Sequence, residues 1–258
     1  MERGSIMPAI DEQIFQAWVG MDLDNQKEEI FPEKTPRVLI IFFSFSGQTS
    51  GLLNQLSLGL KEVGAVVEFE KLRPINQLRF PVGGVFSTLV MMLTTFVRSR
   101  VPIRELSSAA GSGDYDLIIL AGPTWSYNPS GPVLSLLDRD GKKILAGQNV
   151  LPLISCRGYW RMHWYGLRSL LKKCGATVPN VVAFSHPMPE PWRTIGVFLK
   201  IAGRNPEQSK IFGRRYTRYG HSKKQRDEAW RFGMQIGEAL RRGRSLAELD
   251  FHTQTALP

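Results

Sequence analysis

The sequence has few cysteines and no leader-like N-terminus. Only Cys156 and Cys174 occur among 258 residues, too few for a disulfide framework. Residues 1–10 include Gly4 and Pro8 and have no apolar core, so we expect no secretory signal peptide. The expected setting is reducing and cytoplasmic.

The sequence also lacks a pattern of metal ligands. Its histidines lie far apart and without ligand spacing, so no metal site is predicted. They are His163, His186, His221 and His252.

No long apolar run is free of helix-breaking residues. The uncharged stretch Phe80–Val97 reaches the lower limit of length for a transmembrane helix, but it contains Pro81, Gly83 and Gly84. We expect a helix over the functional site, or an apolar lid that touches a membrane surface, rather than a membrane span.

Acidic residues are too few to balance the basic ones. The chain has 33 Lys and Arg against 23 Asp and Glu, a net charge of +10, and residues 157–244 hold 19 of the basic but only 5 of the acidic residues. This imbalance suggests an anionic partner: a nucleotide phosphate, an acidic protein or an anionic lipid surface. A solvated basic face explains it equally well. Aromatic residues among arginines at 157–168 could stack on bases, but core packing is the favoured interpretation and nucleic acid is not expected.

Short apolar runs alternate with helix-like segments. This alternation predicts an α/β fold with a doubly wound, five-stranded parallel sheet in the order 2-1-3-4-5. Helical spacing of apolar residues predicts helices at 48–63, 132–137, 162–173 and 223–242. The predicted strands are Val38–Phe43, Ala65–Glu70, Asp116–Leu120, Asn149–Ser155 and Val181–Phe184.

Three segments lie outside this pattern. Residues 1–36 form an N-terminal extension whose amphipathic stretch at 9–19 predicts a short helix on the domain surface, or alternatively a homodimer contact. The domain then spans 37–258, with insertions at about 72–113 and 186–220.

Hydroxyl groups and one glycine follow the first strand and precede a helix. In such a unit, unpaired backbone N–H groups and the positive end of the helix dipole point to one spot where an anion can bind. A simple helix cap is the alternative interpretation. The loop contains no Lys, which argues against a nucleoside-triphosphate loop. Its candidate residues are Ser44, Ser46, Gly47, Gln48 and Thr49.

With this S-x-S-G-Q-T loop, the chain resembles flavodoxin-like proteins that bind flavin mononucleotide (FMN). The resemblance covers about residues 37–182 and implies that this loop holds the FMN phosphate. It implies that a second loop, after the third strand, binds the flavin ring, with Trp125 or Tyr127 stacking on it. A third loop, after the fourth strand, would close the other side of the ring. The residues of these two loops are Pro123, Thr124, Trp125, Ser126 and Tyr127, and Cys156, Arg157, Gly158 and Tyr159.

The resemblance predicts an FMN-dependent oxidoreductase. Electrons would come from NAD(P)H or a protein donor and pass to an organic acceptor such as a quinone, and Arg157 beside the ring would favour two-electron chemistry. The alternatives are an electron-transfer flavodoxin with a redox partner protein, and a scaffold without FMN that binds a partner or an anionic membrane. The chain is also similar to a longer subgroup, the dialkylresorcinol-condensing-like proteins. No nucleophile motif supports a condensing activity here.

Overall fold

A computed structural model describes residues 34–107, 114–210 and 212–256 of the chain. The chain divides into two units, Met1–Lys34 and Thr35–Pro258, and the second unit contains every described helix and strand. The helix predicted at 9–19 lies outside the described residues.

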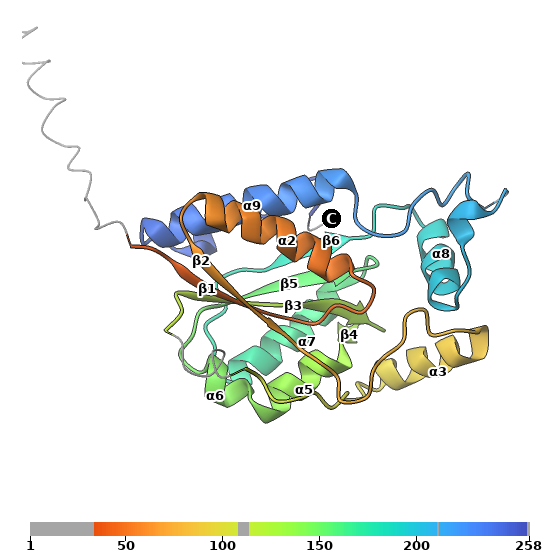
Figure 1. Ribbon diagram of the computed structural model, residues 1–258, viewed down its shortest axis with the longest axis horizontal. Coiled ribbons are helices and arrows are strands. Elements are labelled where there is room, and N and C mark those ends of the chain that lie inside the picture. Colours follow the sequence, from red (N-terminus) through yellow and green to blue (C-terminus); the bar gives the residue numbers. More distant parts are fainter. Residues whose placement is uncertain (1–33, 108–113, 211, 257–258) are drawn as a thin grey trace, which may run out of the picture. The chain divides into compact units, whose positions relative to one another are not determined.

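A six-stranded sheet forms the centre of the second unit (Figure 1). The strands are β1 (Arg37–Phe42), β2 (Val66–Lys71), β3 (Leu117–Trp125), β4 (Asn128–Pro129), β5 (Val150–Cys156) and β6 (Val182–Ser185). Five of them pair in parallel in the order β2-β1-β3-β5-β6. This is the flavodoxin-like order that the sequence predicted. The two-residue strand β4, which was not predicted, pairs antiparallel with β3.

Helices cover both faces of this sheet. The described helices are α2 (Gln48–Glu62), α3 (Val85–Phe96), α5 (Gly131–Arg139), α6 (Gly141–Leu145), α7 (Trp160–Lys173), α8 (Trp192–Ile201) and α9 (Lys223–Arg241), with 3-10 turns at Pro206–Gln208 and Leu246–Glu248. In Figure 1, α2 and α9 lie on one face, and α5, α6 and α7 lie on the other.

Strand β1 contributes to the core on both faces. Val38 and Ile40 pack with the cluster under α2 and α9, whereas Leu39 and Ile41 pack with the cluster under α5 and α7. Each of the four is essentially inaccessible to solvent. A strand buried on both sides needs an uninterrupted apolar run, which is what the sequence provides.

The helices of the two insertions, α3 and α8, are joined by backbone hydrogen bonds. The N–H of Val82 donates to the carbonyl of Ile201 at 2.9 Å, and that of Gly84 donates to the carbonyl of Ala202 at 3.1 Å. In Figure 1 this pair lies beyond the ends of the strands. No helix among the described residues is both long enough and apolar enough to cross a membrane.

Helices α2 and α9 approach each other at glycines. A Cβ atom on Gly233 would collide with the backbone carbonyl oxygen of Leu56, and one on Gly59 would collide with that of Trp230. Since backbone atoms cannot move aside as a side chain does, the two helices must separate if either glycine gains a side chain.

We expect Gly233→Ala to lower the free energy of unfolding by about 2 kcal/mol or more, because it forces this interface apart. Gly51→Ala is the matched control: Gly51 also lies in a helix, and a Cβ there meets nothing within 4 Å. The control should be neutral or stabilise by up to about 1 kcal/mol through helix propensity. Urea denaturation measures both, and equal effects of the two substitutions would contradict the packing described.

Candidate functional site

The predicted loops meet at one edge of the sheet. Phe42 pairs with Ala121, and Ala121 pairs with Leu153, so the carboxyl ends of β1, β3 and β5 lie side by side. In open parallel sheets ligands bind outside these ends, where the chain turns to opposite faces.

The first loop leads into the N-terminus of α2. Gly47 is the N-cap residue, has a left-handed backbone with φ 81° and offers no side chain to cap the helix, whose first turn contains no acidic residue. Ser44 is drawn inward, and its Oγ accepts a hydrogen bond of 3.3 Å from the N–H of Ser50. Thr49 is almost completely buried. The positive end of the helix therefore has no negative group of its own nearby.

Tyr219, from the second insertion, covers this loop. Its hydroxyl forms hydrogen bonds with the side chains of Ser46 and Gln48. Burial raises the pKa of the Tyr219 phenol, and these two hydrogen bonds oppose the rise. Phe80, from the first insertion, stacks on the Tyr219 ring with the centroids 5.9 Å apart and the planes at 16°. Both insertions therefore reach the first loop, Ser44–Thr49.

The second loop is a tight hairpin rather than an open loop. The third strand does not end at Leu120 as predicted but continues to Trp125, and the chain turns at Ser126 and Tyr127 to pair Asn128 with Trp125. Ser126 and Tyr127 have φ 42° and 70°, the left-handed values that a two-residue hairpin requires.

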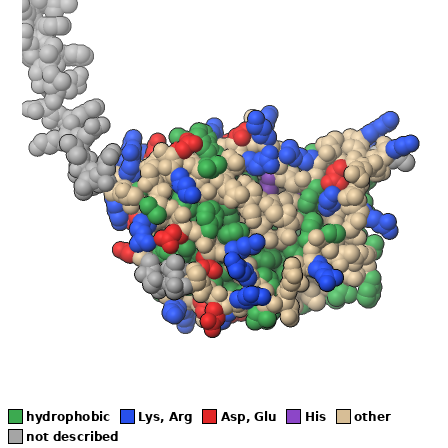
Figure 2. All heavy atoms as spheres, in the orientation of Figure 1, with side chains coloured by type: hydrophobic (Ala, Val, Ile, Leu, Met, Phe, Trp, Pro, Cys, Tyr) green, Lys and Arg blue, Asp and Glu red, His purple; other side chains and the backbone are tan. Residues whose placement is uncertain are grey.

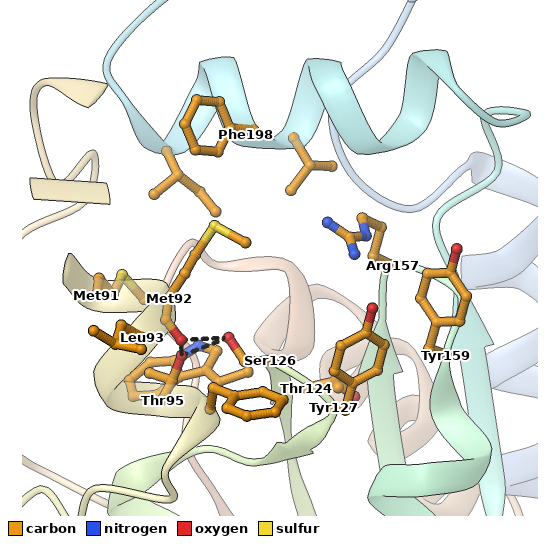
Figure 3. A pocket seen from close by; sticks show the side chains of 14 residues that line it. Met91, Met92, Leu93, Thr95, Thr124, Ser126, Tyr127, Arg157, Tyr159 and Phe198 are labelled. Carbon is orange, nitrogen blue, oxygen red and sulfur yellow. Dashed lines mark hydrogen bonds between the residues drawn. The ribbon is translucent and has the colours of Figure 1, made fainter. Parts of the chain in front are cut away.

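Helix α3 holds this hairpin in place (Figure 3). The Ser126 hydroxyl donates to the carbonyl of Met92 at 2.9 Å and lies 2.7 Å from the Thr95 hydroxyl. The Asn128 amide donates to the carbonyls of Thr95 and Phe96 at 3.3 and 3.2 Å. The left-handed turn is therefore fixed by the end of α3.

The third loop carries an arginine without a partner for one of its donors. The Nε atom of Arg157 is buried and has no hydrogen-bond acceptor among the described residues, while its guanidinium lies 5.6 Å from the centroid of the Tyr159 ring. A Cβ on Gly158 would meet the Arg193 guanidinium at 2.6 Å. Burial raises the pKa of the Cys156 thiol to about 11, so this cysteine is an inert core residue rather than a thiolate nucleophile.

Two adjoining cavities lie between the loops and the insertions. The smaller, of about 110 Å³, is lined by the first loop, and the larger, of about 400 Å³, lies between α3, α8 and the hairpin. In Figure 3, Arg157 points into the larger cavity from the loop after β5, opposite Met92 and below Phe198. Six residues line both cavities: Met91, Thr124, Trp125, Arg157, Val197 and Ile201.

Eleven of the fourteen predicted site residues line these cavities. The other three are Ser44, which is turned to the Ser50 amide, Gly47 at the helix cap, and Gly158 against Arg193. Trp125 packs edge to face against Phe43 and Phe45, with centroids 5.5 and 5.6 Å away. Residues that sequence reasoning missed come mainly from the insertions, whose apolar and aromatic content was the only signal: Phe80, Met91, Val197, Phe198, Ile201 and Tyr219.

Three buried histidines support the walls of the site. His163 bonds to Thr124 at 2.7 Å, His221 to Ser155 at 2.8 Å, and His186 to the Tyr216 hydroxyl at 3.1 Å. Burial lowers the pKa of His163 to about 3, and those of His186 and His221 to about 4. All three are therefore neutral at pH 7. Within the described residues, no three His, Cys, Asp or Glu side chains come together as metal ligands.

Comparisons with known proteins find similarity only among solved structures. No family model matches the sequence, and no curated protein matches it. A flavoprotein in complex with FMN from Lactobacillus acidophilus NCFM is 20% identical, with 57% of this chain and 92% of that chain covered and a TM-score of 0.45. A WrbA-like flavodoxin from Agrobacterium tumefaciens is 14% identical, with 80% and 98% covered and a TM-score of 0.42. The flavodoxin of Megasphaera elsdenii is 21% identical, with 64% and 95% covered and a TM-score of 0.37. The fold assignment rests on the strand order and helix layers described above.

We expect the protein to lose stability in acid. The unfolded chain takes up protons on these histidines near pH 6.5, whereas the folded chain does so only near pH 3 to 4. Stability is therefore complete above about pH 6.5 and declines below it, by about 1.4 kcal/mol per pH unit for each histidine. His163→Gln should remove one such contribution to the slope of the unfolding free energy against pH. His252→Gln, at an exposed position, should leave the slope unchanged. Denaturant unfolding from pH 7 to 4.5 measures this, and an unaltered slope in His163→Gln would refute the assignment.

Proposed function

We propose that the protein binds FMN and passes electrons from NAD(P)H or a protein donor to a hydrophobic organic acceptor such as a quinone. One observation carries the proposal: a loop suited to a phosphate opens into an apolar cavity of about 400 Å³, and an arginine with an unpartnered donor lies where the two cavities meet. A polar anion site beside apolar room is what a flavin phosphate and ring require.

The first loop fits a phosphate group by its donors. Ser46, Gln48 and Thr49 line the smaller cavity, and the N-terminus of α2, where Ser44 bonds to the N–H of Ser50, adds other backbone N–H groups and a positive dipole end. At about 110 Å³ this cavity is too small for a whole nucleotide, but a phosphate can occupy it while the ring extends into the adjoining space. Tyr219 would then donate to the phosphate in place of its present partners, Ser46 and Gln48.

Arg157 and the aromatic residues fit a flat ring. When bound, FMN supplies a conjugated ring that accepts and releases electrons. The buried Nε of Arg157 would find an acceptor on the ring edge, and its charge would stabilise negative charge that develops there. Trp125, Tyr127 and Tyr159 supply aromatic surface around the same space.

The larger cavity favours an enzyme over a simple carrier of electrons. Met92, Phe96 and Phe198 give it apolar walls that would exclude water and accept an apolar molecule. Cys156 does not support the condensing activity of the similar subgroup, since its thiol is buried and stays protonated.

One observation favours a scaffold without FMN. Tyr219 already occupies the hydrogen-bonding groups of Ser46 and Gln48, so the loop has internal partners. Flavin binding must displace these hydrogen bonds, and the titration below separates the two functions.

We expect FMN to bind the purified protein and Ser46→Asp to raise its Kd by about tenfold or more, because a carboxylate would repel the phosphate. Thr49→Val, which removes one hydroxyl without changing the shape of the side chain, should weaken binding by about five- to tenfold. Ser87→Asp, exposed on α3 and outside both cavities, is the control and should bind as the wild type does. Quenching of flavin fluorescence measures all four proteins. Failure of the wild type to bind would favour the scaffold, and unchanged binding in both loop variants would refute the phosphate assignment.

We expect the FMN-loaded protein to oxidise NADH or NADPH when a quinone is present, as followed by absorbance of the nicotinamide. Phe198→Arg should slow this reaction by about tenfold or more, because a charge in the larger cavity opposes an apolar acceptor. Because the flavin ring would extend into the cavity that Phe198 lines, the FMN affinity of this variant is measured in parallel, and the reaction rates are compared at saturating FMN. A flavin-loaded protein that oxidises neither nicotinamide would support an electron carrier instead.

A further inference from the structure

Helix α3 exposes most of its apolar side chains and buries two of its three threonines. Phe86, Leu89 and Leu93 are 80%, 51% and 66% exposed, whereas Thr88 is fully buried and Thr95 nearly so. The buried hydroxyls donate to carbonyls of their own helix, Thr88 to Gly84 and Thr95 to Met92. A helix in a water-soluble domain normally has the opposite arrangement. We call the outward side of this helix the α3 face, which consists of Val85, Phe86, Leu89, Val90, Leu93, Phe96 and Val97.

The α3 face is fixed in position from both ends. At the start of α3, the N–H of Gly84 donates to the carbonyl of Ala202 after α8. At its end, Arg98 Nε donates to Asn128 Oδ1 at 2.8 Å, and Ser126 bonds to Thr95 and Met92. These contacts use the polar groups of the helix, so its apolar side chains are held outward rather than folded onto the sheet.

The insertion that carries this face, and the second insertion that is hydrogen-bonded to it, are rich in basic residues. The two insertions, 72–113 and 186–220, contain twelve Lys and Arg against three Asp and Glu, a net charge of +9, while the whole chain has +10. Nine exposed members form no ion pair with any other residue that the structure describes: Arg73, Arg79, Arg98, Arg104, Arg204, Lys210, Arg214, Arg215 and Arg218. In Figure 2, hydrophobic side chains gather at the lower right, where Figure 1 places α3, and basic side chains stand along the right edge near α8.

We propose that the α3 face docks on an anionic lipid surface, with its apolar side chains among the acyl chains and the basic residues of the insertions at the headgroups. Charge complementarity and the apolar character of the face support this occupant. The outer side of α3 offers few polar groups to a protein partner. Its two hydroxyls are those of Ser87 and Thr94. Thr94 is satisfied by its own helix, through the carbonyls of Val90 and Met91, and only Ser87 remains.

Docking would also place the larger cavity at the lipid surface. Leu93 and Phe96 belong both to the α3 face and to the lining of this cavity. An apolar acceptor dissolved in the bilayer would then enter without crossing water. This consequence rests on the proposed function, whereas the docking itself does not.

Sedimentation with vesicles tests the docking. The full chain is mixed with vesicles of phosphatidylcholine alone, or of equal parts phosphatidylcholine and phosphatidylglycerol, and the bound fraction is measured. We expect binding to the anionic vesicles, and a decrease of at least about tenfold in the partition coefficient for the double variant Phe86→Glu/Leu89→Glu. Leu58→Glu, at an exposed apolar position on α2, is the control and should bind as the wild type does.

A second pair of variants tests the charges. Arg214→Glu/Arg218→Glu should weaken binding to the anionic vesicles by about tenfold or more. Lys142→Glu/Lys143→Glu changes the net charge equally on exposed residues of α6 and should have a smaller effect. Equal losses in the two pairs would show attraction by net charge alone and would overturn the docking of this face.

Three further outcomes would overturn the proposal. They are a wild-type protein that remains in the supernatant, a Phe86→Glu/Leu89→Glu variant that sediments as the wild type does, and a homodimer in analytical ultracentrifugation that this variant dissociates. Neither Phe86 nor Leu89 lines either of the two cavities of the candidate site, so FMN titration of the same variant reports the proposed function separately. Vesicle binding without FMN binding would refute that function and leave the docking intact.

Discussion

The burial of β1 on both of its faces is the constraint on which the structure depends. Val38 and Ile40 face one helix layer, Leu39 and Ile41 face the other, and β1 lies inside the sheet between β2 and β3. Because β1, β3 and β5 are parallel neighbours, their carboxyl ends lie at the same end of the sheet. The loop at Ser44–Thr49 is therefore held beside the other two loops by the core itself.

The insertions complete what this core leaves open. Phe80 and Tyr219 lie 139 positions apart in the sequence, yet they stack on each other above the first loop. Helix α3 fixes the hairpin at Ser126 and Tyr127 while it forms a wall of the larger cavity. Helix α3 therefore supplies both a wall of the candidate site and the exposed α3 face.

The sequence predicted the core well because its signals are local. The apolar run of β1, the hydroxyls after it and the helical spacing of α2 all lie within residues 37–62, and the strand order follows from the alternation of elements. The hairpin was missed because left-handed turns are usually marked by Gly or Asn, and here Ser126 and Tyr127 adopt them under tertiary contacts. A helix over the site within Phe80–Val97 was expected, but the residues of the second insertion that line the cavities were not, because contacts between distant segments bring them there. The roles of the buried histidines follow from burial, which spacing along the chain does not reveal.

The central claim is that a phosphate at the first loop anchors a flavin whose ring lies near Arg157. Calorimetric titration of the wild-type protein with FMN and with riboflavin tests it most directly, because the two ligands share the ring and differ only in the phosphate. We expect FMN to bind and riboflavin to bind at least about tenfold more weakly, since riboflavin makes no charge-assisted hydrogen bonds with the loop. Equal affinity for the two ligands, or no binding of either, would contradict it.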